Sequence, residues 1–306
     1  MALTQQICDN NGIIASRGNF VNTGTGPTLQ PIDIGHPEYI SLIDPDTAFW
    51  LLVKRNRLAE ALTDKGLMKA YRKKAKEFAD EMDNLRFFQR PSAVYFNPTE
   101  RCNLNCSYCY IPEEMRRDGS HMSEKSLLDA LSRLKNYFSQ TLPQGSVPQI
   151  VFHGAEPLLN RDAVFAGIEQ FKNDFRFGVQ TNSTLLDDKA VEFLISRDVS
   201  IGISLDAPTA AIADRTRKNW EGDGVYKKSI EAMERLKGYP SWSVICTITS
   251  ENMRYLTKVV EFFHEKEAPT CLLNILRCTL QPSRKNRPAD AAAARHFLSA
   301  LDRTYE

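Results

Sequence analysis

The chain lacks a long apolar run, a marked imbalance of charge and a secretion signal. No stretch of its 306 residues approaches the roughly 20 apolar residues that cross a bilayer. The first residues, MALTQQICDNNG, have neither the basic start nor the apolar core of a signal peptide. A net charge of +1 provides no field that attracts nucleic acid. We therefore expect a cytoplasmic globular protein that binds neither a membrane nor nucleic acid.

A disulfide framework is not expected either, although the chain has seven cysteines. Three of them, Cys102, Cys106 and Cys109, fall within the short segment TERCNLNCSYCY. In a large chain without a signal peptide, such clustering indicates metal or redox chemistry rather than disulfides.

The other four cysteines are scattered along the chain. Cys246 lies inside the apolar segment WSVICTITS and Cys271 opens the next one, so both are expected to be buried as small hydrophobic residues. Cys278 follows the last predicted strand without a partner, and Cys8 lies in an irregular leader where we expect no role.

Residues 1–90 are predicted to be an N-terminal extension, irregular at first and then mainly helical. The first 35 residues or so are rich in Asn, Gly, Thr and Pro and show no sustained period. A helical stripe follows, with one apolar residue every three or four positions. Its members are Leu67, Tyr71, Ala75, Phe78 and Met82. The predicted helices do not show the strand pattern that a leader-peptide recognition module would need.

Residues 91–306 alternate between strands and helices, which predicts a second domain of the α/β class. Strands are expected in SAVYFNPT, PQIVFHG, FRFGVQTN, SIGISLD, WSVICTITS and CLLNIL, each followed by a helical segment. Such alternation implies a parallel sheet. Six units without the two-fold pattern of a nucleotide-binding sheet predict a partial (β/α)6 TIM-like barrel. Its chemistry is then expected at the carboxyl ends of the strands.

The cysteine segment follows the first predicted strand, and two kinds of metal site fit three thiolates there. A structural zinc site needs four closed ligands, and His121 would complete a Cys3His set. No second cysteine pair follows at zinc-site distance. A [4Fe–4S] cluster on three thiolates leaves one iron with an open position, where a substrate or cofactor would bind.

The spacing C-x3-C-x2-C, with Tyr108 before the last cysteine, resembles the radical S-adenosylmethionine (SAM) superfamily. HGAEPLL, VQTNSTLL, ISLDAP and ADRTRKNWEGDGVY follow in that family's order. They are most similar to the SPASM-type branch of anaerobic sulfatase-maturating enzymes and ribosomal-peptide maturases. The resemblance covers about residues 92–280 and does not extend to residues 1–90.

This resemblance implies a [4Fe–4S] cluster on the three cysteines, with SAM bound at the open iron and Tyr108 at the cofactor. One electron from the cluster would cleave SAM to a 5′-deoxyadenosyl radical, which takes hydrogen from a substrate carbon. The implied partners are a peptide or protein substrate and an electron donor such as flavodoxin or ferredoxin. A small-molecule substrate, or a non-catalytic iron–sulfur or zinc protein, are the alternatives.

The resemblance also assigns residues after the second strand to SAM. HGAEP is similar to the family's GGEP loop, with Ala155 in place of the second glycine. Gly154 would let the backbone approach the ligand closely. Glu156 or a local carbonyl would accept hydrogen bonds from the SAM ammonium, and His153 would bond to SAM or to a buried backbone group. An ordinary strand-to-helix turn is the alternative.

Residues after the third and fourth strands complete the implied cofactor site. Gln180 and Asn182 would face ribose or the peptide substrate, or else close a polar turn. Ser204 and Arg217 would hold the SAM carboxylate, with Arg215 as the alternative arginine.

Relatives in this branch usually carry a further cysteine-rich C-terminal region that holds auxiliary clusters. This chain stops at Glu306 within a helical pattern that has no cap. We therefore expect either a fragment, which the uncapped end favours, or an enzyme that works with one cluster.

Overall fold

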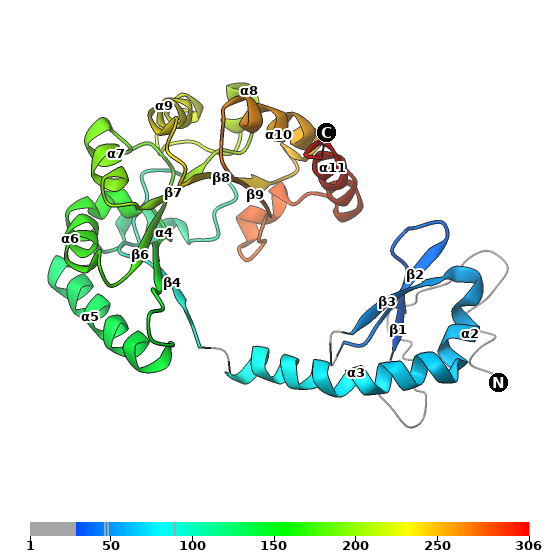
Figure 1. Ribbon diagram of the computed structural model, residues 1–306. Coiled ribbons are helices and arrows are strands. Elements are labelled where there is room, and N and C mark those ends of the chain that lie inside the picture. Colours follow the sequence, from blue (N-terminus) through cyan, green and yellow to red (C-terminus); the bar gives the residue numbers. More distant parts are fainter. Residues whose placement is uncertain (1–28, 46, 48, 89, 306) are drawn as a thin grey trace. The chain divides into compact units, whose positions relative to one another are not determined.

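The computed structural model describes residues 29–45, 47, 49–88 and 90–305. The chain divides into two compact units, Met1–Arg90 and Pro91–Glu306 (Figure 1). Within the described part of the chain, no helix is both long enough and apolar enough to cross a membrane.

The N-terminal unit contains a three-stranded antiparallel sheet that the sequence did not lead us to expect. The strands are β1 (Gln30–Ile32), β2 (Tyr39–Ile43) and β3 (Trp50–Lys54), in that order in the sheet. They are followed by the turn η1 (Arg55–Arg57), the helices α2 (Leu58–Thr63) and α3 (Lys65–Asp83), and the turn η2 (Asn84–Phe88). The helical prediction is confirmed, but the expectation that this extension has no strand pattern is wrong.

A small core joins this sheet to the helices. One face of the sheet buries Ile40, Leu42 and Val53 against Leu58 of α2. Nearby, the hydroxyl of Tyr71 on α3 donates to Oδ2 of Asp44 at 2.6 Å. Because Asp44 is fully buried, this bond fixes α3 to the chain that leaves β2.

The C-terminal unit is a parallel sheet with helices on its outer face (Figure 1). Its strands are β4 (Ala93–Phe96), β5 (Gln149–Phe152), β6 (Arg176–Thr181), β7 (Ser200–Ser204), β8 (Trp242–Ile248) and β9 (Cys271–Ile275). The main helices are α5 (Glu124–Thr141), α6 (Arg161–Phe171), α7 (Asp188–Ile195), α9 (Tyr226–Leu236), α10 (Leu256–Glu265) and α11 (Asp290–Arg303). Shorter elements are α4 (Glu113–Asp118), η3 (Pro157–Asn160), α8 (Ala210–Ala213), η4 (Met253–Tyr255) and η5 (Gln281–Asn286).

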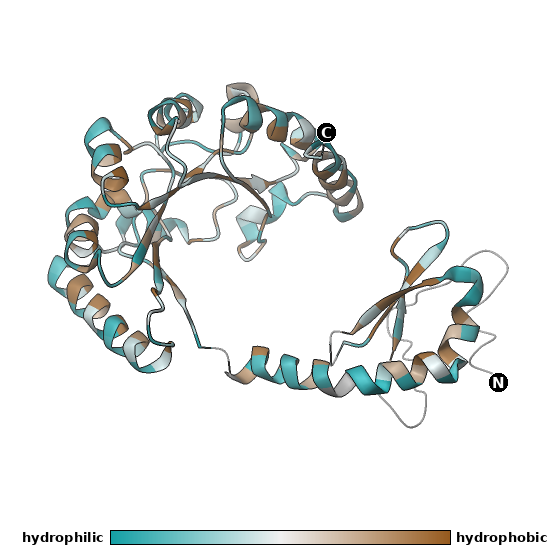
Figure 2. Cartoon of the chain, viewed as in Figure 1, coloured by the Kyte–Doolittle hydropathy of each residue, from teal (hydrophilic) through white to brown (hydrophobic). Residues whose placement is uncertain are grey.

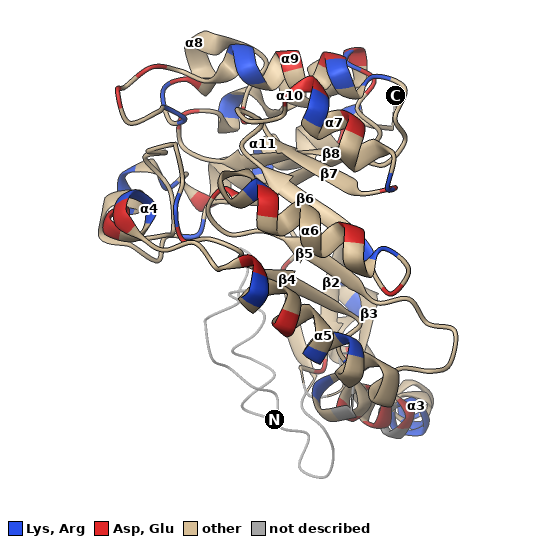
Figure 3. Cartoon of the chain, turned by 90° about the vertical axis from the view of Figure 1, so that its left-hand side faces the viewer, with Lys and Arg blue, Asp and Glu red and all other residues tan. Residues whose placement is uncertain are grey.

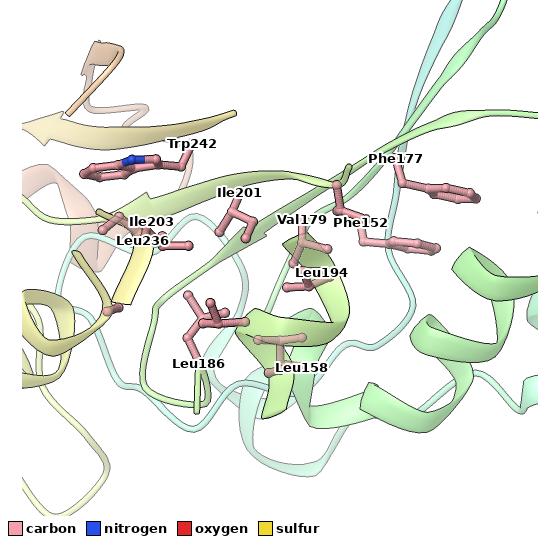
Figure 4. Packing of buried hydrophobic residues seen from close by; sticks show 14 of the residues in the cluster. Phe152, Leu158, Phe177, Val179, Leu186, Leu194, Ile201, Ile203, Leu236 and Trp242 are labelled. Carbon is pink, nitrogen blue, oxygen red and sulfur yellow. The ribbon is translucent and has the colours of Figure 1, made fainter. Parts of the chain in front are cut away.

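The strands pair in sequence order from β4 to β9, so the predicted half-barrel is confirmed. Strand residues that face the helices are apolar and fully buried, as with Phe152, Val179 and Ile203. Figure 4 shows these side chains between the sheet and the helices. Figure 2 shows the same division, with apolar residues on the sheet and polar residues on the outer faces of the helices.

Charged residues are almost absent from this sheet, and most lie on the helices and loops (Figure 3). Arg176 is the one charged residue within β4 to β9. Among the described residues of this unit, the buried charged ones are Arg116, Glu156, Asp206 and Arg217, and all four lie in connections that follow a strand. The buried charge of the unit is thus concentrated where the half-barrel rule expects chemistry.

Candidate cluster and cofactor site

The loop that carries the cysteines, residues 97–112, is tied to the connection that follows β7. The ties are hydrogen bonds from Asn105 N to Lys218 O at 2.7 Å and from Ser107 N to Thr216 O at 2.9 Å. Leu104 and Asn219 form an antiparallel bridge between the same segments. The first and fourth connections therefore hold each other in place at the mouth of the half-barrel.

Trp220 adds further contacts between these two connections. Its indole Nε1–H donates to the carbonyl oxygen of Cys102 at 2.9 Å. The guanidinium carbons of Arg116 and Arg117 lie 5.3 and 4.9 Å from the centre of its ring. Such cation–π contacts contribute about 0.5–1 kcal/mol each at exposed sites. The backbone at the first cysteine is therefore fixed by protein contacts alone.

Cys102, Cys106 and Cys109 are free thiols, and all three are partly exposed. Burial, with a smaller contribution from the carboxylate of Glu156, raises the pKa of Cys102 to about 12. Burial also raises the pKa of Cys106, and the guanidinium of Arg217 opposes that rise. Both thiols are therefore protonated at neutral pH until a metal binds and displaces their protons.

The thiols are not arranged around one ion. Among the residues that the structure describes, no three His, Cys, Asp or Glu side chains are grouped to hold a single metal ion. His121, the fourth ligand of the zinc alternative, is exposed and forms a short bridge with Thr99. In a four-iron cluster each thiolate binds a different iron, so the sulfurs do not have to converge. Three thiolates that each bind a different iron leave the fourth iron open.

Tyr108, Asp206 and Arg217 form one buried hydrogen-bonded group. The Tyr108 hydroxyl donates to Oδ2 of Asp206 at 2.5 Å and accepts from Nη1 of Arg217 at 2.7 Å. The ion pair between Arg217 and Asp206 spans 3.9 Å, and Thr247 N donates to the other Asp206 oxygen at 2.9 Å. Burial raises the pKa of Asp206, while Arg217, Tyr108 and Thr247 oppose the rise.

The guanidinium of Arg217 also has an unused donor. Its Nε atom is buried and has no hydrogen-bond partner among the described residues. Buried donors are nearly always paired in folded proteins, so this atom indicates an acceptor supplied by a ligand. Arg215, the alternative arginine, is exposed and pairs with Glu251 at 3.2 Å. Of the two, only Arg217 lies in the buried group.

Glu156, expected to bind the SAM ammonium, is instead fully buried and occupied by protein donors. Oε1 accepts from the Thr181 hydroxyl at 2.7 Å and from Leu158 N at 3.1 Å. Oε2 accepts from Asn182 N at 2.7 Å. Burial raises the pKa of this carboxyl, and these three bonds oppose the rise. Glu156 thus joins the end of β6 to the turn after β5.

The side chain of Asn182, which was expected to face ribose or the peptide substrate, also forms its hydrogen bonds with other residues of the protein. Its Nδ2 donates to Oδ1 of Asn103 at 2.7 Å and to Sγ of Cys102 at 3.7 Å. Its Oδ1 accepts from the backbone N and the hydroxyl of Thr184 at 3.0 and 2.6 Å. Its side chain therefore lies against the first cysteine.

The other expected residues after β5 lie at the mouth of the half-barrel. Gly154 has φ +106°, and a Cβ there would lie 2.5 Å from Oδ1 of Asn97. His153 is partly buried, with its ring edge-on to Tyr95 at 5.4 Å between centroids. Burial, and to a lesser degree Arg277, lowers the pKa of His153. Ala155 is partly buried in the same turn.

Gln180 and Ser204 were expected in the cofactor site, and their side chains are not engaged by other described residues. Both are partly exposed near the ends of β6 and β7, and their side-chain polar atoms form no hydrogen bond with described residues. Both are therefore available to a ligand, and their roles stay predictions.

The scattered cysteines differ in burial. Cys246 is fully buried, whereas Cys271 is only partly buried, less than we expected for a core residue. Cys278 is also partly buried and lines a cavity of about 230 Å³ beside Arg287. Cys8 lies outside the described residues.

Several contributors to the site had no assigned role at the level of the sequence. They are Asn103, Arg116, Asp206 and Trp220. Asp206 does follow a strand, so the same strand-end rule would have found it. Asn103 and Trp220 act through contacts with residues about 80 to 120 positions away, which no local pattern reveals.

Residues 96–263, more than half of the chain, match the sequence family described as the Radical SAM superfamily. The chain belongs to the radical SAM superfamily. This radical SAM protein is 34% identical over 262 residues to an uncharacterized protein of Archaeoglobus fulgidus, which covers 86% of this chain and 58% of the relative. It is 26% identical over 191 residues to a serine-type anaerobic sulfatase-maturating enzyme of Bacteroides thetaiotaomicron, covering 58% of this chain and 44% of that enzyme. The chain thus spans about half the length of the curated relatives it matches.

Two solved structures share the fold of this chain. One is native anSMEcpe with bound AdoMet and Cp18Cys peptide, with a TM-score of 0.59 and 24% identity over 69% of this chain and 59% of that chain. The other is Streptococcus suis SuiB bound to precursor peptide SuiA, with a TM-score of 0.54 and 13% identity over 89% of this chain and 69% of that chain. At these identities the likeness concerns the fold alone.

Radical SAM proteins use a [4Fe–4S] cluster and SAM as cofactors. The residues of this chain fit both groups. Three free thiols lie on one braced loop, which suits a cluster with one open iron. The unpaired Nε of Arg217 suits an anionic group such as the SAM carboxylate.

Proposed function

We propose that this protein uses SAM to abstract hydrogen from a residue of a peptide or protein, as part of peptide maturation. The observation that carries the proposal is that three free thiols occur together with a buried arginine, Arg217, whose Nε has no hydrogen-bond partner in the part of the chain that the structure describes. When bound, the cluster and SAM supply a 5′-deoxyadenosyl radical that takes a hydrogen atom from carbon. The chain's own residues bind and orient these groups.

Each residue has a defined part in this arrangement. Cys102, Cys106 and Cys109 would hold the cluster through deprotonated sulfurs. Arg217 and Ser204 would hold the SAM carboxylate. Tyr108 would fix the guanidinium of Arg217, with Asp206 fixing Tyr108 in turn.

The turn after β5 would complete the SAM site. Gly154 and Ala155 would bring backbone close to the ligand, because neither has a bulky side chain. Glu156 would hold this turn in position, since its carboxylate oxygens already accept three hydrogen bonds from the protein. His153 and Gln180 would face the ligand or the substrate.

The relatives support a peptide rather than a small molecule as the substrate. Sulfatase-maturating enzymes are among the similar proteins, and the SuiB structure contains its precursor peptide. The SuiB likeness extends over 89% of this chain, which includes part of the N-terminal unit. There, edge strand β3 exposes Trp50 and Leu52, and edge strands bind extended peptides through backbone hydrogen bonds. We propose that the N-terminal unit, taken by itself, binds an extended segment of the peptide along β3.

The experiment is anaerobic reconstitution followed by measurement of iron, sulfide, zinc and 5′-deoxyadenosine, with dithionite and then flavodoxin or ferredoxin as the electron donor. About four irons per chain and formation of 5′-deoxyadenosine are expected from cluster chemistry. Stoichiometric zinc with no 5′-deoxyadenosine would overturn the proposal.

Cysteine variants make the test specific. Cys102→Ala, Cys106→Ala and Cys109→Ala should each abolish SAM cleavage, whereas Cys246→Ala, a buried cysteine outside the loop, should keep it. Full activity of Cys106→Ala would contradict the assignment. For the substrate, short peptides encoded next to the gene are incubated with the enzyme, and a change in peptide mass is the expected result. Turnover of small molecules alone would overturn the peptide part.

A further inference from the structure

Asn103, Asn182 and Thr184 close a ring of side-chain hydrogen bonds beside the first cysteine. Asn103 Nδ2 donates to Thr184 Oγ1 at 2.8 Å, and that hydroxyl donates to Asn182 Oδ1 at 2.6 Å. Asn182 Nδ2 then donates to Asn103 Oδ1 at 2.7 Å. The ring uses one of the two hydrogens on Asn182 Nδ2. The second hydrogen is available to Sγ of Cys102, at 3.7 Å.

The orientation of the Asn182 amide follows from its other contacts. Oδ1 accepts from the backbone N of Thr184 at 3.0 Å. A flipped amide would place its NH2 group against that backbone donor, which leaves two donors facing each other. The amide nitrogen, and not the oxygen, is therefore the atom that faces the sulfur of Cys102.

The position of Asn182 is fixed from the backbone side as well. Its backbone N donates to the buried carboxylate of Glu156 at 2.7 Å, and its side chain is nearly inaccessible to solvent. A buried amide with this many partners has little freedom to turn away from the sulfur.

The sulfur of Cys102 differs from the sulfurs of Cys106 and Cys109 in the N–H donors that reach it. Its sulfur accepts from Leu104 N at 3.4 Å as well as from Asn182 Nδ2. Among the described residues, no corresponding N–H donor reaches the sulfur of Cys106 or Cys109. Two donors therefore concentrate on one of the three sulfurs.

We propose that Asn182 raises the reduction potential of the [4Fe–4S] cluster by donating its side-chain N–H to the sulfur of Cys102. Reduction adds a negative charge that spreads onto the cysteine sulfurs. A donated hydrogen bond stabilises that charge, and hydrogen bonds to the sulfurs are among the factors that set cluster potentials. Asn182 thus acts through Cys102 rather than on ribose. The inference rests on Cys102 being a cluster ligand, as in the proposed function.

The test is an anaerobic redox titration of the reconstituted full chain, followed by electron paramagnetic resonance. Asn182→Ala removes the donor, and Asn182→Asp replaces it with an acceptor of nearly the same shape. For Asn182→Ala we expect about a tenfold lower ratio of reduced to oxidised cluster at a fixed potential, equal to about 59 mV for a one-electron couple. Asn182→Asp should shift the potential further in the same direction.

Asn286→Ala is the matched control. Asn286 donates to the carbonyl oxygen and hydroxyl of Ser107, in the same loop, at 3.0 and 3.1 Å, but to no sulfur. Its potential should equal that of the wild type. A potential unchanged in Asn182→Ala with four irons retained, or an equal shift in Asn286→Ala, would overturn the proposal.

A measurement on the wild type covers the case in which the Asn182 variants do not fold. Asparagine labelled with 15N only at the side-chain amide is incorporated, and pulsed resonance spectra of the reduced cluster are recorded. A coupled amide nitrogen is expected, and its absence would overturn the proposal. The proposed function fails separately, if Cys102→Ala retains its full iron content.

Discussion

The hydroxyl of Tyr108 donates to Oδ2 of Asp206 over 2.5 Å, although the two residues are 98 positions apart in the sequence. The hydroxyl oxygen of Tyr108 in turn accepts a hydrogen bond from Nη1 of Arg217 at 2.7 Å. A tyrosine next to Cys109, one of the three proposed cluster ligands, thereby links the first connection of the half-barrel to the fourth. The hydroxyl of Tyr108 thus bonds to both buried charged groups of the site, the carboxylate of Asp206 and the guanidinium of Arg217.

Tyr108→Phe should therefore destabilise the protein and weaken SAM binding together. Without the hydroxyl, Asp206 and Arg217 each lose a buried hydrogen bond, which costs about 1–3 kcal/mol of unfolding free energy. Urea unfolding and equilibrium dialysis with SAM measure the two effects. Tyr226→Phe is the control, because its hydroxyl bonds only to the carbonyl oxygen of Pro208 at 2.6 Å. Equal loss of SAM affinity in both variants would contradict the role of Tyr108.

Arg217→Lys should weaken SAM binding about 10- to 100-fold, because hydrogen bonds to charged groups contribute about 1.5–3 kcal/mol. Lysine keeps the positive charge but lacks the fork of donors that includes Nε. Anaerobic calorimetry on the cluster-loaded protein measures the affinity. Arg215→Lys should match the wild type, since Arg215 is exposed in a surface ion pair. The reverse ranking of the two variants would reassign the carboxylate to Arg215.

Gly154→Ala should destabilise the protein by about 1–3 kcal/mol, the usual cost of a residue held in a strained backbone region. The new Cβ would also crowd the side chain of Asn97 at 2.5 Å. Gly222→Ala separates the two causes, because Gly222 has φ +95° and nothing within 4 Å of its Cβ position. The difference between their unfolding free energies measures the contact with Asn97. No difference would mean that Asn97 simply moves aside.

His153 should titrate below its ordinary value of 6.5, because burial and then Arg277 lower its pKa. The unfolded chain then binds a proton at a higher pH than the folded chain does. The stability contributed by neutral His153 is thus present above pH 6.5 and is lost as the pH falls through the folded pKa. Nuclear magnetic resonance of the ring C–H measures the midpoint, and Arg277→Gln should raise it. A midpoint above 6.5 would contradict the prediction.

The sequence predicts the half-barrel well because its signals are local. Each strand from β4 to β9 is a short apolar segment, and each is followed by a helix. Two of these helices also begin at a capping side chain, because Ser123 accepts from Ser126 N at 3.1 Å and Asp187 accepts from Ala190 N at 2.8 Å. Residue periodicity and capping are properties of neighbours in the chain, so a single sequence contains them.

The sheet of the N-terminal unit was missed because its strands are only three to five residues long. A signal was available in two apolar runs, YISLI and WLLVK, separated by the turn-forming residues around Pro45. Short strands depend on pairing with each other and on burial against α2 and α3, and neither is visible in local patterns.

The sequence supplies candidate residues for the site, but not the contacts that these residues form with one another. The three cysteines and Arg217 come from motifs in the sequence. The resemblance placed Glu156, or a local carbonyl, at the SAM ammonium, and Asn182 at ribose or the peptide substrate. In the structure the backbone N of Asn182 donates to the carboxylate of Glu156. Such contacts form between strand ends that meet only in the folded sheet, so residue spacing does not reveal them.

The bond between Asn286 and Ser107 joins residues 179 positions apart. A ribosome adds about 5–20 residues per second, so the cysteine loop is made roughly 10 to 40 seconds before this partner. The contacts of the loop with residues 216–220 can form earlier, and the Asn286 bond is added to them last.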